Sequence, residues 1–173
     1  MSEIEEEIAQ KIAEGFGLVN APLLIQLLHH GDKVSVLEFC ARTGGNMKWL
    51  LIKYSCGVDV ITATIDITLG KEPDVTIRDT GHKVVVDDFI YCTPGVFDHF
   101  EGFDEMVELG YINEFHPVRI KGTEMRGVTS SSDRIAGMNI VAESVEEFNM
   151  KEKYILDHVK VVDINGNDIM RRD

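Results

Sequence analysis

The sequence has few cysteines, no long hydrophobic segment and no signal-peptide pattern. Its cysteines, Cys40, Cys56 and Cys92, are odd in number and form no Cys-x-x-Cys pair, which argues against a zinc ribbon or a disulfide scaffold. No apolar run approaches the roughly 18 residues that a membrane span requires. The N-terminus is acidic, unlike a secretory signal. We therefore expect reduced cysteines, a cytoplasmic location and no membrane partner.

Dense groups of basic residues are also absent. The chain has 30 Asp and Glu against 17 Lys and Arg, for a formal net charge of -13. Binding to duplex DNA or RNA needs clustered Lys and Arg to neutralise phosphates, and the pair Arg171-Arg172 is too short for that role. We expect no nucleic-acid partner.

The length and composition are those of an ordinary globular protein. At 173 residues, with 44% hydrophobic and 27% charged residues, the chain is long enough for one domain with a real core. No internal repeat, low-complexity segment or linker interrupts it. We predict a single domain over 1–173, whose first part, 1–70, and second part, 71–173, differ in their patterns.

The first part begins with an amphipathic helix, predicted over residues 3–16. Ser2 and Glu5 fit a capping box at its start. Apolar residues recur every four positions and make one stripe along it: Ile4, Ile8, Ile12 and Phe16. Gly15 and Gly17 are placed to stop the helix.

A β-hairpin follows, with two more helices after it. The runs Leu23–His30 and Lys33–Ala41 resemble strands, and Gly31-Asp32 between them is a strong turn signal. Gly44-Gly45 then breaks the chain before a helix predicted over 46–56, and another helix is predicted over 58–69. Gly57 and Gly70 stop these two helices.

The second part is predicted to be rich in strands. The candidates are Lys83–Cys92, Val118–Lys121, Met138–Ala142 and a terminal hairpin over 160–170 that turns at Asn165-Gly166. A helix is predicted over 145–158, capped by Ser144, with Glu146 and Glu147 in its first turn. Strands linked mostly by hairpins and interspersed with helices predict an α+β fold, an antiparallel sheet with flanking helices.

The first hairpin carries the side chains that are best suited to bind a ligand. With a three-residue loop at 31–33, His30 pairs with Val34, and Gln26 lies directly opposite Glu38, with Cβ atoms about 4.5–5.5 Å apart. Strand alternation predicts that other residues share this face, which is then half apolar: Leu24, Leu28, Val34, Val36, Cys40 and Arg42.

A carboxylate on such a surface must be paired or must bind a cation. Magnesium prefers hard oxygen ligands and takes one or two from protein, which Glu38 and Gln26 offer. Arg42 suits phosphate oxygens, and Gly44 and Gly45 let a backbone N–H approach an anion closely. The alternative interpretation is a plain salt bridge between Glu38 and Arg42, because structural ion pairs are common.

The segment from Leu37 to Gly45, LEFCARTGG, resembles the ATP-grasp signature, which runs Glu-x-Asn-x-Arg before a Gly-rich turn. The family's first ligand lies one strand earlier, where this chain has Gln26, and glutamine there is similar to the large subunit of carbamoyl phosphate synthetase. The lead-in over 12–20 and the segment over 56–70 also resemble the family. A weaker resemblance covers 126–170, where Ser132 and Arg134 lie in a Ser-rich loop.

The resemblance implies an ATP-grasp ligase, which phosphorylates a small carboxylate with ATP before an amine or similar nucleophile attacks. It implies the C-terminal lobe of that domain, with magnesium or manganese held by Glu38 and Gln26. It also implies that Arg42 contacts the transferred phosphate, with Thr43, Gly44 and Gly45 beside it. Arg126 and Arg134 flank the Ser-rich loop that contains Ser132, and this loop is expected to bind substrate carboxylate or phosphate, or else to be an ordinary polar surface loop with incidental arginines.

Two departures from the family pattern limit this implication. Cys40 stands where the family usually has Asn, and a thiol is a poor magnesium ligand. No segment resembles the family's upstream nucleotide-binding lobe, so we expect that lobe to be a missing partner and the 173 residues alone to be inactive. The rival expectation is a non-catalytic interaction or assembly module. Apolar surface that a missing lobe once covered can also drive homo-oligomer formation.

Overall fold

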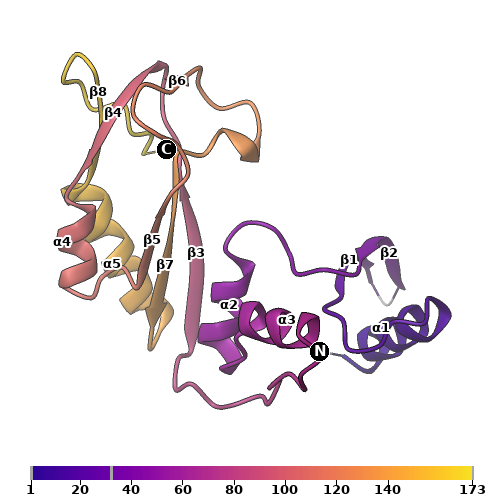
Figure 1. Ribbon diagram of the computed structural model, residues 1–173. Coiled ribbons are helices and arrows are strands. Elements are labelled where there is room, and N and C mark those ends of the chain that lie inside the picture. The colour runs from indigo at the N-terminus through magenta and orange to yellow at the C-terminus, as the bar shows by residue number, and fades with distance from the viewer. Residues whose placement is uncertain (1, 32, 173) are drawn as a thin grey trace. The chain divides into compact units, whose positions relative to one another are not determined.

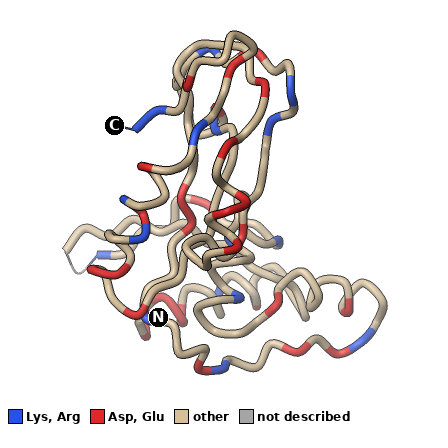
Figure 2. Tube along the Cα trace, turned by 90° about the vertical axis from the view of Figure 1, so that its left-hand side faces the viewer, with Lys and Arg blue, Asp and Glu red and all other residues tan. Residues whose placement is uncertain are grey.

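The computed structural model describes residues 2–31 and 33–172. The chain divides into two compact units, Met1–Arg78 and Asp79–Asp173, a few residues after the change of pattern in the sequence (Figure 1). Acidic residues outnumber basic ones and are found along both units (Figure 2). Within the described residues, no helix combines the length and the apolar character needed to cross a bilayer.

The first unit contains three helices and one hairpin. Helix α1 spans Glu3–Gly15, and the predicted capping box between Ser2 and Glu5 is present at its start. Strands β1 and β2 follow at Leu24–His30 and Lys33–Cys40, and form a two-stranded antiparallel sheet.

Helices α2 and α3 complete the first unit at Lys48–Cys56 and Val60–Thr68. Gly57 ends α2 in a left-handed conformation with φ 74°, as its position after the helix predicts. Asp59 caps α3 by accepting hydrogen bonds from the N–H groups of Ile61 and Thr62. The buried hydrophobic residues of this unit are few: Met47, Leu50, Val58 and Ala63.

The second unit contains two three-stranded antiparallel sheets. The first has the order β3-β7-β5, from strands Val84–Ile90, Ala136–Ala142 and Glu114–Pro117. The second has the order β6-β4-β8, from strands Glu124–Met125, Gly95–Glu101 and Lys160–Asp163. These pairings confirm an α+β fold with antiparallel sheets and flanking helices.

Two α-helices and a short 3-10 helix complete this unit. Helix α4 spans Phe103–Glu108, the 3-10 helix η1 spans Ser131–Asp133, and α5 spans Val145–His158. Ser144 caps α5 as predicted, because its hydroxyl accepts from the N–H of Glu147 at 3.2 Å.

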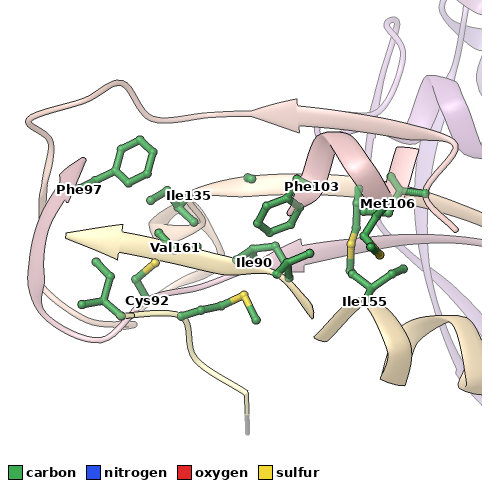
Figure 3. Packing of buried hydrophobic residues seen from close by; sticks show 14 of the residues in the cluster. Ile90, Cys92, Phe97, Phe103, Met106, Ile135, Ile155 and Val161 are labelled. Carbon is green, nitrogen blue, oxygen red and sulfur yellow. The ribbon is translucent and has the colours of Figure 1, made fainter. Parts of the chain in front are cut away.

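The hydrophobic core of the second unit draws on both sheets and both α-helices (Figure 3). Ile90, Phe97, Ile135 and Val161 come from the strands or lie next to them, while Phe103, Met106 and Ile155 come from the helices. The Phe103 and Phe115 rings stack at a centroid distance of 4.4 Å. Phe97 and Phe100 on β4 also pack together, with ring centroids 4.7 Å apart, and Phe100 contacts Phe103 at 5.4 Å.

One predicted strand is absent. Residues 118–121 form no strand, and the ladder in this region is β5, Glu114–Pro117, which pairs with β7. Pro117 has no backbone N–H to continue the ladder, and the N–H groups of Val118 and Arg119 both bond the Ile135 carbonyl instead. The chain therefore leaves the sheet after Pro117, at the residues where the sequence predicts a strand to begin.

Candidate functional site

The hairpin of the first unit places Gln26 opposite Glu38, but by a different route from the predicted one. His30 pairs with Lys33, so the loop has two residues, and the predicted pairing of His30 with Val34 is wrong. An irregularity between Gln26 and Leu27 then leaves Leu37 as an extra residue in β2, a β-bulge. The bulge shifts the register back by one residue, and this shift makes Gln26 and Glu38 partners.

The bulge also changes which residues share the Glu38 face. Val34 and Val36 pair with His29 and Leu27, so they lie on the opposite face from Glu38, contrary to the prediction. The Glu38 face instead carries four cross-strand pairs: Leu24 with Cys40, Gln26 with Glu38, Leu28 with Ser35, and His30 with Lys33.

Helix α1 packs against the face that lacks Glu38. The Phe16 ring lies 4.8 Å from the Phe39 ring, centroid to centroid, and His29 Nε2 lies 3.2 Å from a Glu5 carboxylate oxygen. Gln26 and Glu38 are both exposed on the other face. Leu24, Leu28 and Cys40 keep this face partly apolar, but because Glu38 is exposed, burial does not force it to take a partner.

Glu38 and Arg42 do not form the salt bridge that was the alternative interpretation. Among the ion pairs of residues 2–31 and 33–172, none involves Glu38. The Arg42 guanidinium instead donates to the Thr43 carbonyl oxygen at 2.8 Å. The carboxylate at position 38 is consequently open to a ligand.

Next to the hairpin, a pocket of about 380 Å³ opens in the first unit. Arg42, Thr43 and Gly44 line it, together with Lys48 at the start of α2, and its remaining walls are apolar: Pro22, Leu23, Leu24, Leu51, Ile52 and Val60. Two cationic side chains beside a small, mainly apolar cavity suit an anionic group with an apolar neighbour. Gly45 is not among the lining residues.

The local backbone explains why a glycine stands at position 44. A Cβ atom there would lie 2.9 Å from Cγ of Lys48, so a side chain would push the lysine stem away. Asn46 then takes φ 58°, and Met47 begins α2 without a side-chain cap. The N–H groups of Leu50 and Leu51 both bond the Met47 carbonyl oxygen, at 2.8 and 3.4 Å, and close the first turn of this helix.

Lys48 lines this pocket, and the sequence analysis did not single it out. It directly follows Gly44-Gly45-Asn46-Met47, so a basic residue in the first turn after a glycine pair was the available signal. Cys40, by contrast, is a free and exposed thiol beside Glu38 on the same face of β2. No three His, Cys, Asp or Glu side chains gather into a metal-binding group in the described part of the chain.

Ser132 and Arg134 lie in the second unit, in a loop that is held by its own contacts. The Asp133 carboxylate accepts from the N–H groups of Thr129 and Ser130, and these bonds lower its pKa. Arg134 donates to the Ser131 carbonyl oxygen at 2.8 Å, and its guanidinium lies 5.1 Å from the centre of the Phe89 ring.

A pocket of about 320 Å³ adjoins this loop, but neither Ser132 nor Arg134 lines it. Arg119 and Arg126 do, with the carboxylates of Glu124 and Asp133 nearby. Ser132 and Arg134 therefore belong to the support of the loop, while Arg126, the other predicted arginine, lies on the cavity wall together with Arg119.

This arrangement of elements is the fold of part of an ATP-grasp ligase. No protein-family profile matches the chain, and no curated protein matches it in sequence. The likeness is to solved structures at 15–18% identity, so it establishes the fold alone.

Three of these structures illustrate the match. Phosphoribosylglycinamide synthetase from Anaerococcus prevotii is 16% identical with a TM-score of 0.72, over 90% of this chain and 40% of that one. L-amino acid ligase from Bacillus licheniformis is 17% identical with a TM-score of 0.70, over 94% and 44%. The biotin carboxylase domain of 2-oxoglutarate carboxylase from Hydrogenobacter thermophilus, a dimer in complex with MgADP, ADP and bicarbonate, is 16% identical with a TM-score of 0.65, over 93% and 37%. The chain thus spans less than half the length of each.

Proposed function

We propose that the chain is the C-terminal portion of an ATP- and magnesium-dependent ligase that activates a small carboxylate as an acylphosphate. An amine or similar nucleophile would then attack the acylphosphate. The observation that carries the proposal is the β-bulge register, which sets an amide oxygen and an open carboxylate side by side, next to a pocket with two cations. Carbamoyl phosphate synthetase-like proteins are the proposed kind of parent.

The residues present fit a magnesium ion in part. Glu38 supplies one carboxylate and Gln26 one amide oxygen, and a magnesium ion commonly completes its octahedron with phosphate oxygens and water. Such an ion would neutralise charge on the phosphates during in-line transfer. Manganese prefers the same oxygen ligands and would fit the same set.

The chain's own residues supply the remaining interactions. Arg42 and Lys48 would hold phosphate oxygens, because both side chains line the pocket. Gly44 keeps the lysine stem in place against the loop. ATP and the carboxylate would reach this surface only together with the upstream lobe, which we propose as the partner of the exposed hairpin face.

A titration of the 173-residue chain with Mn²⁺ in the presence of inorganic triphosphate, followed by electron paramagnetic resonance, tests this assignment. Glu38→Gln should weaken ion binding about tenfold, because one anionic ligand is lost. The matched control is Glu3→Gln, which removes an exposed carboxylate of α1 and should leave binding unchanged. Equal binding by Glu38→Gln and wild type would contradict the metal assignment.

A second candidate function is an interaction or assembly module that keeps the fold without catalysis. Cys40 favours it, because a thiol occupies the place of a hard oxygen ligand. Turnover assays on a parent protein that contains both lobes separate the two candidates. Activity that Glu38→Gln abolishes supports the ligase, and inactivity with intact partner binding supports the module.

A further inference from the structure

Another cavity, of about 410 Å³, lies within the second unit, whereas the pocket lined by Arg42 and Lys48 belongs to the first unit. The walls of this cavity come from β3 and the residue after it, from α5, and from residues 171–172. A cavity of this size falls in the range that binds small molecules. No site residue predicted from the sequence lies on it.

Two carboxylates from different elements face this cavity, Asp88 on β3 and Glu152 on α5. Asp88 lies on the same face of β3 as the core residue Ile90, two positions away, so it points to the side of the core. The one described hydrogen bond of its carboxylate is from the N–H of the adjacent Phe89 at 2.7 Å. The Glu152 carboxylate has no hydrogen bond or ion pair with any residue that the structure describes.

The electrostatic state of the pair indicates that neither charge is compensated. Burial raises the pKa of Asp88, against the opposing effect of its Phe89 hydrogen bond. Burial also raises the pKa of Glu152, and the nearby Asp88 charge raises it further. A half-buried carboxylate that lacks a partner weakens folding, and perturbed carboxylates in a cleft are typical of functional sites.

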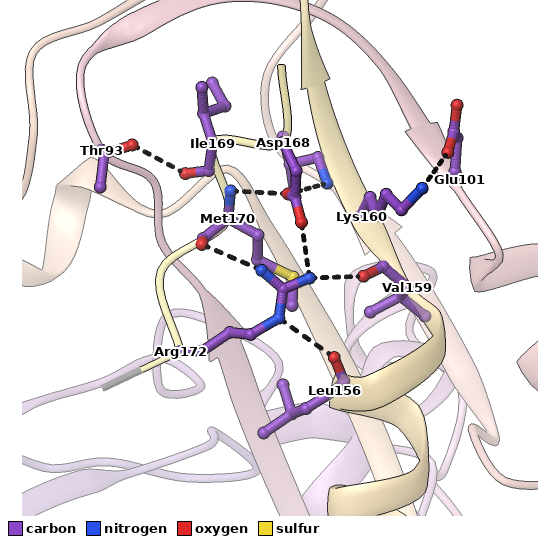
Figure 4. A network of polar contacts seen from close by, with 10 residues as sticks. Thr93, Glu101, Leu156, Val159, Lys160, Asp168, Ile169, Met170 and Arg172 are labelled. Carbon is purple, nitrogen blue, oxygen red and sulfur yellow. Dashed lines mark hydrogen bonds and ion pairs between the residues drawn. The ribbon is translucent and has the colours of Figure 1, made fainter. Parts of the chain in front are cut away.

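Arg172 also lines the cavity, and its guanidinium is already paired with Asp168. Its guanidinium donates to the carbonyl oxygens of Leu156 and Val159 at 3.2 and 2.9 Å, and to Asp168 Oδ2 at 2.7 Å (Figure 4). These bonds fix it to the C-terminal end of α5, so it is not positioned to neutralise Glu152. Arg171 is the other basic residue on the cavity, and Val128 and Leu156 provide apolar walls.

We propose that this cavity binds a small molecule with an ammonium group on a short aliphatic stem. The Asp88 and Glu152 carboxylates accept hydrogen bonds from the ammonium group, and Val128 and Leu156 contact the stem. A simple amine and an α-amino acid share this chemistry. The proposal does not depend on the metal and phosphate assignment, because it rests on other residues in the other unit.

The test uses the full 173-residue chain labelled with ¹⁵N and three matched probes. The probes are 3-methylbutylamine, L-leucine, and 4-methylpentanoate, which is leucine without its ammonium group. Amide shifts of Phe89 and Leu156 should respond to one or both ammonium compounds and not to 4-methylpentanoate. Absence of a response to either ammonium probe, or an equal response to 4-methylpentanoate, overturns the proposal.

Two variants tie the response to the carboxylates. Asp88→Asn and Glu152→Gln should each weaken binding about tenfold or more, because a charged acceptor becomes neutral. Glu146→Gln is the matched control, since it removes an exposed carboxylate from the same helix outside the cavity. Unchanged binding in both pocket variants contradicts the proposal.

A stability measurement tests whether Glu152 serves only to stabilise the fold. If the carboxylate serves a ligand rather than the fold, Glu152→Gln leaves the thermal unfolding midpoint unchanged or raises it, because an uncompensated buried charge is removed. A lower midpoint for this variant shows that the carboxylate stabilises the fold through another partner, and it overturns the proposal.

Discussion

Phe103 is the side chain on which the core of the second unit most depends. It is 1% exposed, stacks on Phe115 and meets the Phe100 ring edge to face at 5.4 Å. Phe103→Ala removes these contacts and leaves a cavity, so we expect a loss of about 3–5 kcal/mol in the free energy of unfolding. Urea unfolding followed by circular dichroism measures the change. Ile164→Ala, at a 59% exposed position, should stay within about 0.5 kcal/mol of wild type.

Cys40 offers a direct test of the departure from the ATP-grasp pattern. Cys40→Asn places an amide oxygen beside Glu38, so the Mn²⁺–triphosphate affinity of the chain should rise, by about tenfold if the oxygen joins the ion. Cys40→Ala removes the thiol without adding an oxygen and should give no gain. If both variants bind alike, position 40 takes no part in ion binding.

The Asp88 and Glu152 pair also predicts a pH effect on stability. Burial raises both pKa values, so the folded state binds protons more readily than the unfolded state above the ordinary carboxyl pKa of about 4. Stability therefore falls as pH rises from the ordinary carboxyl pKa through the raised pKa values, and the pair's penalty is fully present above them. Arg171 and Arg172 are the other charged residues that line the cavity.

The difference between wild type and a double variant, Asp88→Asn with Glu152→Gln, isolates this effect. The variant should gain stability relative to wild type as pH rises above about 4, because only wild type then acquires the two charges. Parallel thermal midpoints for the two proteins at all pH values would show that these carboxylates titrate normally.

The sequence alone predicted that Gln26 pairs with Glu38, although the three-residue loop on which this prediction depended was wrong. Leu37 is an ordinary strand residue by composition, so no local pattern marks it as the extra residue of a bulge. The position of Lys48, in the first helical turn after a glycine pair, could have marked it in the sequence, whereas no local pattern marks Asp88 or Glu152. They are 64 positions apart in sequence (152 − 88), and only the packing of α5 near β3 brings them to one cavity.

At the scale of elements, the turn between β4 and α4 depends on Gly102. This glycine has φ 80°, and a Cβ atom there would lie only 2.5 Å from the His158 carbonyl oxygen. Gly102→Ala therefore combines backbone strain of about 1–3 kcal/mol with a clash against backbone that cannot easily move. We expect it to destabilise the second unit severely.

Gly110 provides the matched control for that prediction. It has φ 75°, but nothing lies within 4 Å of a Cβ built there, so Gly110→Ala carries the conformational cost alone, about 1–2 kcal/mol. Thermal unfolding of the two variants measures the difference. Equal losses would show that the space around Gly102 adjusts to a methyl group.

The long elements were predictable from sequence and the short ones were not. Helices α1 and α5 have clear caps and apolar periodicity, and both were placed within a residue or two. Strand β4 has a register irregularity between Phe97 and His99 that breaks its alternation, and α4 has six residues bracketed by glycines. Short elements of this kind are specified by the core that they complete, which local patterns do not reveal.

At the scale of the whole molecule, the two units should differ in stability. Among residues 2–31 and 33–78, the buried hydrophobic residues are Met47, Leu50, Val58 and Ala63, while the large core cluster lies entirely in the second unit. Trp49, the only tryptophan of the sequence, belongs to the first unit and makes its fluorescence a specific reporter. We expect the Trp49 transition at lower urea concentration than the loss of hydrogen-exchange protection in β7. Coincident transitions would mean that the units unfold as one.

The β-bulge at Leu37 also bears on how similar sequences can be recognised. Twelve positions separate Gln26 from Glu38 (38 − 26), and a chain without the extra residue would have eleven, yet it would form the same cross-strand pair with an unbroken ladder. The number of residues between Gln26 and Glu38 is therefore a poor guide to whether a similar sequence forms this cross-strand pair. A search pattern should allow a one-codon insertion or deletion at this point, while a change of one residue elsewhere in either strand would turn the carboxylate to the side covered by α1.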